Sequence, residues 1–125
     1  MARILVIDDE LHIREMLAKL LTRHGHEVLT AEDGRQGIQL HSKQPVDLVI
    51  TDIIMPEVEG MEVIRVFKHN FSTVPIIAIS GGGRIEPYTY LKMAEELGAT
   101  RTFKKPFETK ELIQTIKELL NHSTE

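Results

Sequence analysis

Five side chains that suit metal and phosphate chemistry stand where short apolar runs of this chain end: Asp8, Asp9, Asp52, Ser80 and Lys105. If the runs are strands of one parallel sheet, these residues share the edge at which such sheets bind ligands. Neighbouring carboxylates repel one another unless a pKa rises or a cation binds. A hard divalent cation, above all Mg²⁺, relieves that repulsion and accepts phosphate oxygens as further ligands. The set therefore predicts a phosphoryl-transfer site, in which a protein mainly positions groups and stabilises charge.

Within this set Asp52 is the candidate nucleophile, which would form an aspartyl phosphate. Lys105 would balance the charge on one phosphoryl oxygen, and the Ser80 hydroxyl would donate to another. Each residue alone also has a structural interpretation. Asp8 and Asp9 suit a helix N-cap and a first-turn acid, whereas Ser80 suits a turn and Lys105 a solvated surface. Because four strand ends carry such residues together, we favour the shared site.

Apolar periodicity predicts five strands that alternate with five helices. The strands are expected at residues 4–7, 27–31, 46–50, 76–79 and 101–104. The first helix is marked by apolar residues three and four positions apart, which are Ile13, Met16, Leu17, Leu20 and Leu21. The later helices are expected at 34–42, from Met61 to Phe71, from Pro87 to Leu97 and from Glu108 onward, with Gly25 and Gly98 as helix stops. This alternation requires an α/β fold, a parallel sheet with helices on both faces.

Bulk composition limits the class of protein. The chain has 125 residues, of which 42% are hydrophobic and 27% charged, as in an ordinary globular domain, and we interpret residues 1–125 as one domain. A net charge of −4 argues against a nucleic-acid binder, which would carry a basic face. No apolar run reaches membrane-spanning length, and the absence of cysteine excludes disulfides and thiolate chemistry. A cytoplasmic location fits these features.

The motifs, taken together, resemble the response-regulator receiver domain of two-component signalling (CheY-like). The residues that carry the resemblance run from the first strand to the last helix: Asp8-Asp9-Glu10, Asp52 with Met55-Pro56 and Gly60, Ser80, Gly98-Ala99, and Lys105-Pro106-Phe107. Any one of these motifs is weak, whereas all of them in this order are specific. The resemblance implies a flavodoxin-like, doubly wound sheet of strand order 2-1-3-4-5.

The same resemblance implies a phosphorylation-activated switch that catalyses only its own phosphotransfer and dephosphorylation. Asp52 would accept a phosphoryl group from a sensor histidine kinase or a histidine phosphotransfer protein. Asp9 would ligate Mg²⁺ directly, Asp8 mostly through water, and the backbone carbonyl of Ile54 would be a further ligand. Ser80 and Lys105 would register the phosphoryl group and alter the contact with a downstream protein target. No direct contact with nucleic acid or membrane is expected.

Two departures from the family pattern concern the switch. The family usually carries an aromatic residue three positions before the lysine, where this chain has Thr102. Phe103 beside it would point to the other face of a regular strand. Three glycines, residues 81–83, follow Ser80. The first glycine leaves room for a phosphoryl group, and the other two allow the loop a wide range of backbone conformations. Ile54 is bulky and apolar, so it would shield an acyl phosphate from water.

Two other interpretations fit parts of the sequence. A receiver excised from a longer regulator with a separate output domain has the same motifs, and the polar residues 121–125 suit either a terminus or the start of a linker. A metal-dependent phosphohydrolase would use the same carboxylates. Against it, the chain shows no cap domain, no substrate cleft beyond the sheet edge and no second carboxylate placed as a general acid. Multiple turnover of a substrate would decide between the switch and the hydrolase.

Six histidines also raise the question of a metal or relay site. His24 and His26 flank Gly25, where we interpret both as surface turn residues rather than metal ligands. The other four, His12, His41, His69 and His122, lack the spacing typical of a metal site. The sequence therefore predicts no site built on histidine.

Overall fold

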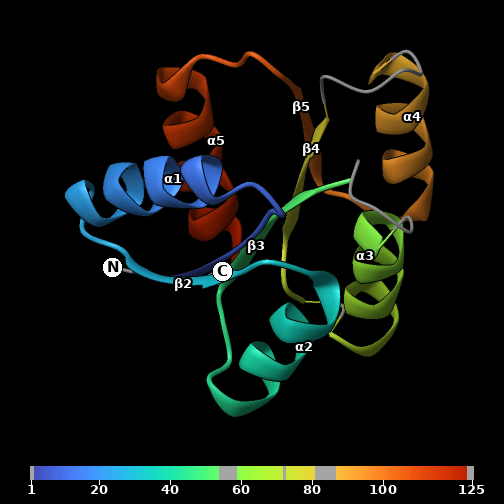
Figure 1. Cartoon of the computed structure of the whole chain (residues 1–125), viewed down its shortest axis with the longest axis horizontal. Helices are drawn as coiled ribbons and strands as arrows, with labels where there is room; N and C mark the ends of the chain where they lie inside the picture. Colours follow the sequence, from blue (N-terminus) through green and yellow to red (C-terminus); the bar gives the residue numbers. More distant parts are fainter. Residues whose placement is uncertain (1, 54–58, 72, 81–86, 124–125) are drawn as a thin grey trace.

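The computed structural model describes residues 2–53, 59–71, 73–80 and 87–123. Strands and helices alternate along the chain (Figure 1) in the order β1 (Arg3–Ile7), α1 (Leu11–Arg23), β2 (Glu27–Ala31), α2 (Gly34–Lys43), β3 (Leu48–Asp52), α3 (Glu59–Asn70), β4 (Ile76–Ser80), α4 (Pro87–Leu97), β5 (Arg101–Lys104) and α5 (Thr109–Ser123). Every expected strand and helix is therefore present. None of the helices in the described part of the chain is long and apolar enough to cross a membrane.

The five strands form one parallel sheet in the order β2-β1-β3-β4-β5, which confirms the predicted winding. Their register brings the carboxyl ends of neighbouring strands level. Ile7 of β1 pairs with Thr51 of β3, and Asp52 of β3 pairs with Ile79 of β4. Residues that follow or end these strands are therefore held at one edge of the sheet by the backbone itself.

The third strand lies two residues later than the apolar run predicts. It starts at Leu48; two residues earlier, the backbone N–H of Val46 donates to Nδ1 of His41 on α2, at 3.0 Å. At its other end Asp52 is itself a strand residue, whereas the run alone predicts that Asp52 follows the strand. Asp52 thus belongs to a strand of the sheet rather than to a loop.

Helices cover both faces of the sheet (Figure 1), and each layer buries its own core. Side chains alternate along β1, so that Ile4 and Val6 enter the core beneath α1 and α5, whereas Leu5 and Ile7 enter the core beneath α2, α3 and α4. The central strands β3 and β4 are buried along their whole length, as their continuous apolar sequence predicts. These two cores hold the strand ends rigidly in place.

Some expected features of the helices need correction. Met16 of α1 is 39% exposed, although its spacing places it in the apolar set. At about 100° per residue it lies at the margin of the buried stripe, whose centre is occupied by Leu17 and Leu21. Phe71 lies one residue beyond the end of α3, but its N–H still donates to the carbonyl of Phe67.

The expected stop after α1 is confirmed. Gly25 has a φ of 88°, the left-handed conformation expected there.

Candidate functional site

Two buried carboxylates lie side by side at the carboxyl edge of the sheet. Asp8 follows β1, where its N–H donates to the carbonyl of Ala31 on β2, and Asp52 ends β3. The pairing of Ile7 with Thr51 makes Asp8 and Asp52 neighbours across the two strands. Only 2% of Asp8 and 3% of Asp52 are exposed. Buried charges of like sign need a compensating cation, so this pair defines the centre of the site.

Two further acids complete a cluster around this pair. Each of Asp8, Asp9, Glu10 and Asp52 offers one carboxylate oxygen, and these oxygens all lie within 4.8 Å of one another. Asp9 and Glu10 are exposed, so the cluster opens to solvent on their side. The structure therefore brings together the three carboxylates that the sequence singles out. It also adds Glu10, which the sequence analysis assigns to the motif but not to the site.

Lys105 bridges the two buried carboxylates. Its Nζ lies 3.1 Å from Oδ2 of Asp52 and 3.4 Å from Oδ2 of Asp8, and its side chain is 18% exposed. The Lys105 N–H donates to the carbonyl of Ser80 at 2.7 Å, which fixes the residue to the end of β4. Burial lowers the pKa of Lys105, but the charges of Asp52 and Asp8 outweigh it, so the pKa lies above its usual value. Lys105 is therefore a fixed cation in the site.

Ser80 is the last residue of β4 and is fully buried. Its Oγ has no hydrogen-bond partner among the residues that the structure describes. A buried hydroxyl without a partner costs stability, about 1–3 kcal/mol in general. A ligand can supply the missing partner of such a group. Asp52 pairs with Ile79, so Ser80, the next residue of β4, lies at the same edge as the acidic cluster.

The remaining predicted positions divide into two groups. Ile54 and glycines 81–83 lie outside the described residues, so their expected roles stay predictions. On β5, Oγ1 of Thr102 donates to Oε1 of Glu95 on α4 at 3.3 Å. Phe103 packs in the opposite core, beneath α1 and α5, with its ring centroid 6.0 Å from that of Phe107. The expectation that neighbouring residues 102 and 103 face opposite sides of the sheet is confirmed.

The donors suit a hard divalent cation. All the side-chain atoms that the cluster offers are carboxylate oxygens, which Mg²⁺ prefers, and the histidines described here lie outside the group of clustered ligands. The unpartnered Ser80 hydroxyl and the Lys105 ammonium lie at the same edge, where a phosphoryl oxygen would be held. Asp8, Asp9 and Asp52 are thus the residues that would hold Mg²⁺.

A sequence model of the response regulator receiver domain matches residues 4–117. This chain belongs to that family. Receivers are signalling switches of two-component systems, and the acidic cluster with Asp52 fits their phosphoacceptor site. The receiver domain protein of Clostridium thermocellum, known from its crystal structure, superposes with a TM-score of 0.89 at 32% identity. That alignment covers 99% of this chain and 98% of the other.

Three curated relatives differ in how much of their length this receiver matches. The response regulator MprA of Mycolicibacterium vanbaalenii is 31% identical over 98% of this chain, but over only 52% of its own length. A probable transcriptional regulatory protein of Picosynechococcus is matched over 49% of its length, at 36% identity. Sporulation initiation phosphotransferase F of Bacillus subtilis, by contrast, is matched over 93% of its length at 28% identity. The chain thus spans about half the length of the first two.

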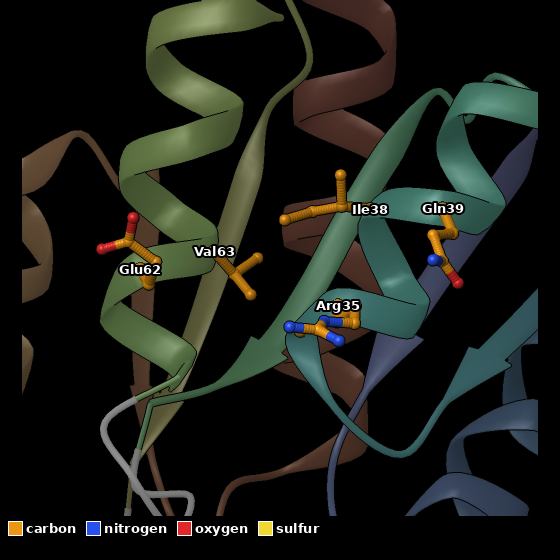
Figure 2. A pocket seen from close by; sticks show the side chains of 6 residues that line it. Arg35, Ile38, Gln39, Glu62 and Val63 are labelled. Atoms are coloured by element: carbon orange, nitrogen blue, oxygen red, sulfur yellow. The ribbon is translucent and has the colours of Figure 1, made fainter.

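The receiver also has a hollow away from the acidic cluster. It lies between α2 and α3, has a volume of about 320 Å³, and includes none of the four clustered acids in its described lining. Figure 2 shows Ile38 of α2 and Val63 of α3 pointing toward each other across it, while the Glu62 carboxylate turns away. The hollow is thus an apolar groove between two helices, separate from the phosphoacceptor chemistry.

Two histidines have structural roles, and of these only His26 is expected as a surface turn residue. His41 is buried, with its ring against Phe67 and Phe71 at centroid distances of 5.1 and 4.4 Å. Its burial lowers its pKa, so the ring is neutral and Nδ1 accepts from the N–H of Val46. His26 is only partly exposed, and its Nδ1 accepts from the N–H of Ala2 at 3.3 Å. Both rings are structural acceptors.

Proposed function

We propose that this receiver is a phosphorylation-activated switch in which Asp52 accepts a phosphoryl group from the phosphohistidine of a sensor histidine kinase or a histidine phosphotransfer protein. The bridge from Lys105 to both Asp52 and Asp8 is the observation that carries the proposal. It supports Asp52 as the nucleophile because Asp52 is the buried carboxylate nearest to the fixed cation. Among the described residues, Lys105 forms ion pairs with Asp52 and Asp8 and with no exposed acid.

In the proposed reaction, a carboxylate oxygen of Asp52 attacks the phosphorus atom of the donor. A bond from oxygen to phosphorus forms and the phosphorus–nitrogen bond of the donor breaks. The departing imidazole nitrogen keeps the electron pair and takes a proton from solvent. When bound to Asp8, Asp9 and Asp52, Mg²⁺ supplies positive charge beside the reacting oxygens.

Two residues would then hold the product. Lys105 Nζ exchanges its present contacts with the carboxylates for a phosphoryl oxygen, and the Ser80 hydroxyl, which lacks a partner among the described residues, donates to another. Because Lys105 stands after β5 and Ser80 ends β4, these new contacts change the positions of groups at the ends of both strands. We propose that this change alters contact with a downstream protein. Loss of the phosphoryl group to water, catalysed by the receiver itself, resets the switch.

The proposal is tested by incubation with acetyl phosphate or phosphoramidate, with and without Mg²⁺, read by intact mass. A gain of one phosphoryl group that depends on Mg²⁺ and disappears in Asp52→Asn is expected. Asp47→Asn is the matched control, because Asp47 is a carboxylate before β3 that accepts from the N–H of Arg3, far from the cluster. Labelling of Asp52→Asn to the level of the wild type would contradict the proposal.

A second candidate keeps this chemistry but changes the output. Since the chain matches only about half of MprA and of the Picosynechococcus regulator, it fits the receiver portion of a longer regulator.

The first candidate, which we favour, is a single-domain receiver of residues 1–125. The match to nearly the whole length of the Bacillus phosphotransferase supports it. We propose that this receiver acts in the cytoplasm. Single-domain function predicts that the 125-residue chain, once phosphorylated, passes its phosphoryl group to a histidine phosphotransfer protein or binds a protein target unaided. Failure of both would favour the longer regulator.

A further inference from the structure

Glu10 occupies an unusual position at the start of α1. It is the N-cap residue, where its carbonyl accepts from the N–H of Arg14, but its side chain makes no capping hydrogen bond. The Glu10 N–H donates instead to Oδ1 of Asp8 at 2.9 Å. This bond ties the backbone of Glu10 to a buried acid of the site. A Glu10 carboxylate oxygen lies within 4.8 Å of the clustered oxygens.

The charges around Glu10 are unbalanced. Within the described residues, the Lys105 ammonium contacts Asp8 and Asp52 but neither Asp9 nor Glu10. The Glu10 carboxylate is 3.2 Å from Nε2 of His12, a ring that is 75% exposed and charged only when protonated. An exposed pair of this kind contributes little, so it is easily exchanged for a stronger partner. A divalent ion at the cluster is that partner.

We propose that Glu10 is a positioning residue for the divalent cation of the phosphoacceptor site, adding a fourth carboxylate to the set of Asp8, Asp9 and Asp52. The inference rests on the proposed function, because that function requires the cation. Mg²⁺ retains several of its waters, and Glu10 supplies a negatively charged acceptor for the ion and its bound waters. The buried Ser80 hydroxyl, which lacks a partner in the described structure, marks the same edge as a ligand site independently of the acids.

The test is the affinity of the whole chain for Mg²⁺, measured by isothermal titration calorimetry without any phosphodonor. Glu10→Gln preserves size and removes the charge, and it is expected to weaken Mg²⁺ binding about tenfold, at the low end for residues that support a metal site. Glu15→Gln is the matched control, because Glu15 is an exposed acid of α1 outside the cluster. Its effect is expected to stay below about twofold, since salt screens a distant exposed charge.

The outcomes separate the inference from the function on which it rests. Unchanged affinity in Glu10→Gln, or an equal loss in Glu15→Gln, would overturn the role of Glu10 while leaving the receiver chemistry intact. Absence of Mg²⁺ binding in the wild type would instead overturn the metal-dependent function. Glu10→Asp keeps the charge on a shorter side chain, so it is expected to bind Mg²⁺ more tightly than Glu10→Gln. Matching melting temperatures in EDTA exclude misfolding as the cause of any difference.

Discussion

Nζ of Lys105 lies 3.1 Å from Oδ2 of Asp52, so the proposed nucleophile is paired with the cation that would later hold its phosphoryl group. The two residues are 53 positions apart, and only the parallel sheet brings them together. In the proposed function, this contact is exchanged for one with the phosphoryl group during phosphorylation. The same contact thus connects the stability of the domain to its switching.

Lys105→Met is expected to lower the free energy of unfolding by about 2 kcal/mol in EDTA, because Asp8 and Asp52 lose their buried cation. Mg²⁺ is expected to restore more stability to this variant than to the wild type, since the lysine no longer competes for the carboxylates. Urea unfolding with EDTA and with Mg²⁺ measures both effects. Lys104→Met, at an exposed position of β5, is the control. If Mg²⁺ raises the free energy of unfolding equally in the variant and the wild type, Lys105 and Mg²⁺ do not compete for the carboxylates.

Ser80→Ala is expected to leave the free energy of unfolding unchanged or raise it by about 1 kcal/mol, because it removes a buried hydroxyl that lacks a partner in the described structure. Phosphorylation by acetyl phosphate is expected to slow, because a donor to the phosphoryl group is lost. Urea unfolding and the labelling rate report the two effects. Ser42→Ala removes a hydroxyl that donates to the carbonyl of Gln39, so it should destabilise slightly and leave labelling unchanged. A marked loss of stability in Ser80→Ala would mean that the hydroxyl is already bonded.

His41 makes the stability of the receiver sensitive to acid. Burial holds its pKa below the unfolded value of about 6.5, so the unfolded chain binds the proton more readily. The stabilising contribution is therefore complete above about pH 6.5 and is lost as the pH falls through the folded pKa. Protonation of Nδ1 would also break the bond from Val46.

His41→Asn tests this effect, because its side-chain oxygen can still accept from the N–H of Val46. Urea unfolding between about pH 5.5 and 8 should give a flatter profile for the variant than for the wild type. A residual slope due to His26 is expected, since burial lowers the pKa of His26 as well. His69→Asn, at an exposed position of α3, should retain the full wild-type slope. An unchanged slope in His41→Asn would contradict the assignment.

The sequence predicts the fold class and the shared edge of the site because both depend on where the apolar runs end. Parallel strands in register finish at one edge, so an acid after the first run and another after the third lie at that edge; that Asp8 and Asp52 are neighbours depends on the strand order, which the family resemblance implies. The alternation of side chains along a strand likewise predicts that Thr102 and Phe103 face different layers. The alternation needs only backbone geometry, whereas the order of the strands does not follow from it.

Features that depend on side-chain direction were not predictable in this way. An N-cap position suggests that an acidic side chain turns to the helix, and nothing local indicates that Glu10 is directed to the cluster instead. His41 is a polar residue at the end of α2, and its burial follows from Phe67 and Phe71, which lie on and just after a different helix. The bond from the Val46 N–H to that buried ring, just before β3, is not indicated by the apolar run either.

The most direct measurement locates the phosphoryl group among the four clustered acids. After incubation with acetyl phosphate and Mg²⁺, borohydride reduces an acyl phosphate to the alcohol, and peptide mass spectrometry then identifies the modified residue. We predict a reduced side chain at position 52 alone, and none when Mg²⁺ is omitted. Modification of Asp8, Asp9 or Glu10 in its place, or a phosphoryl group found on a histidine, would contradict the account.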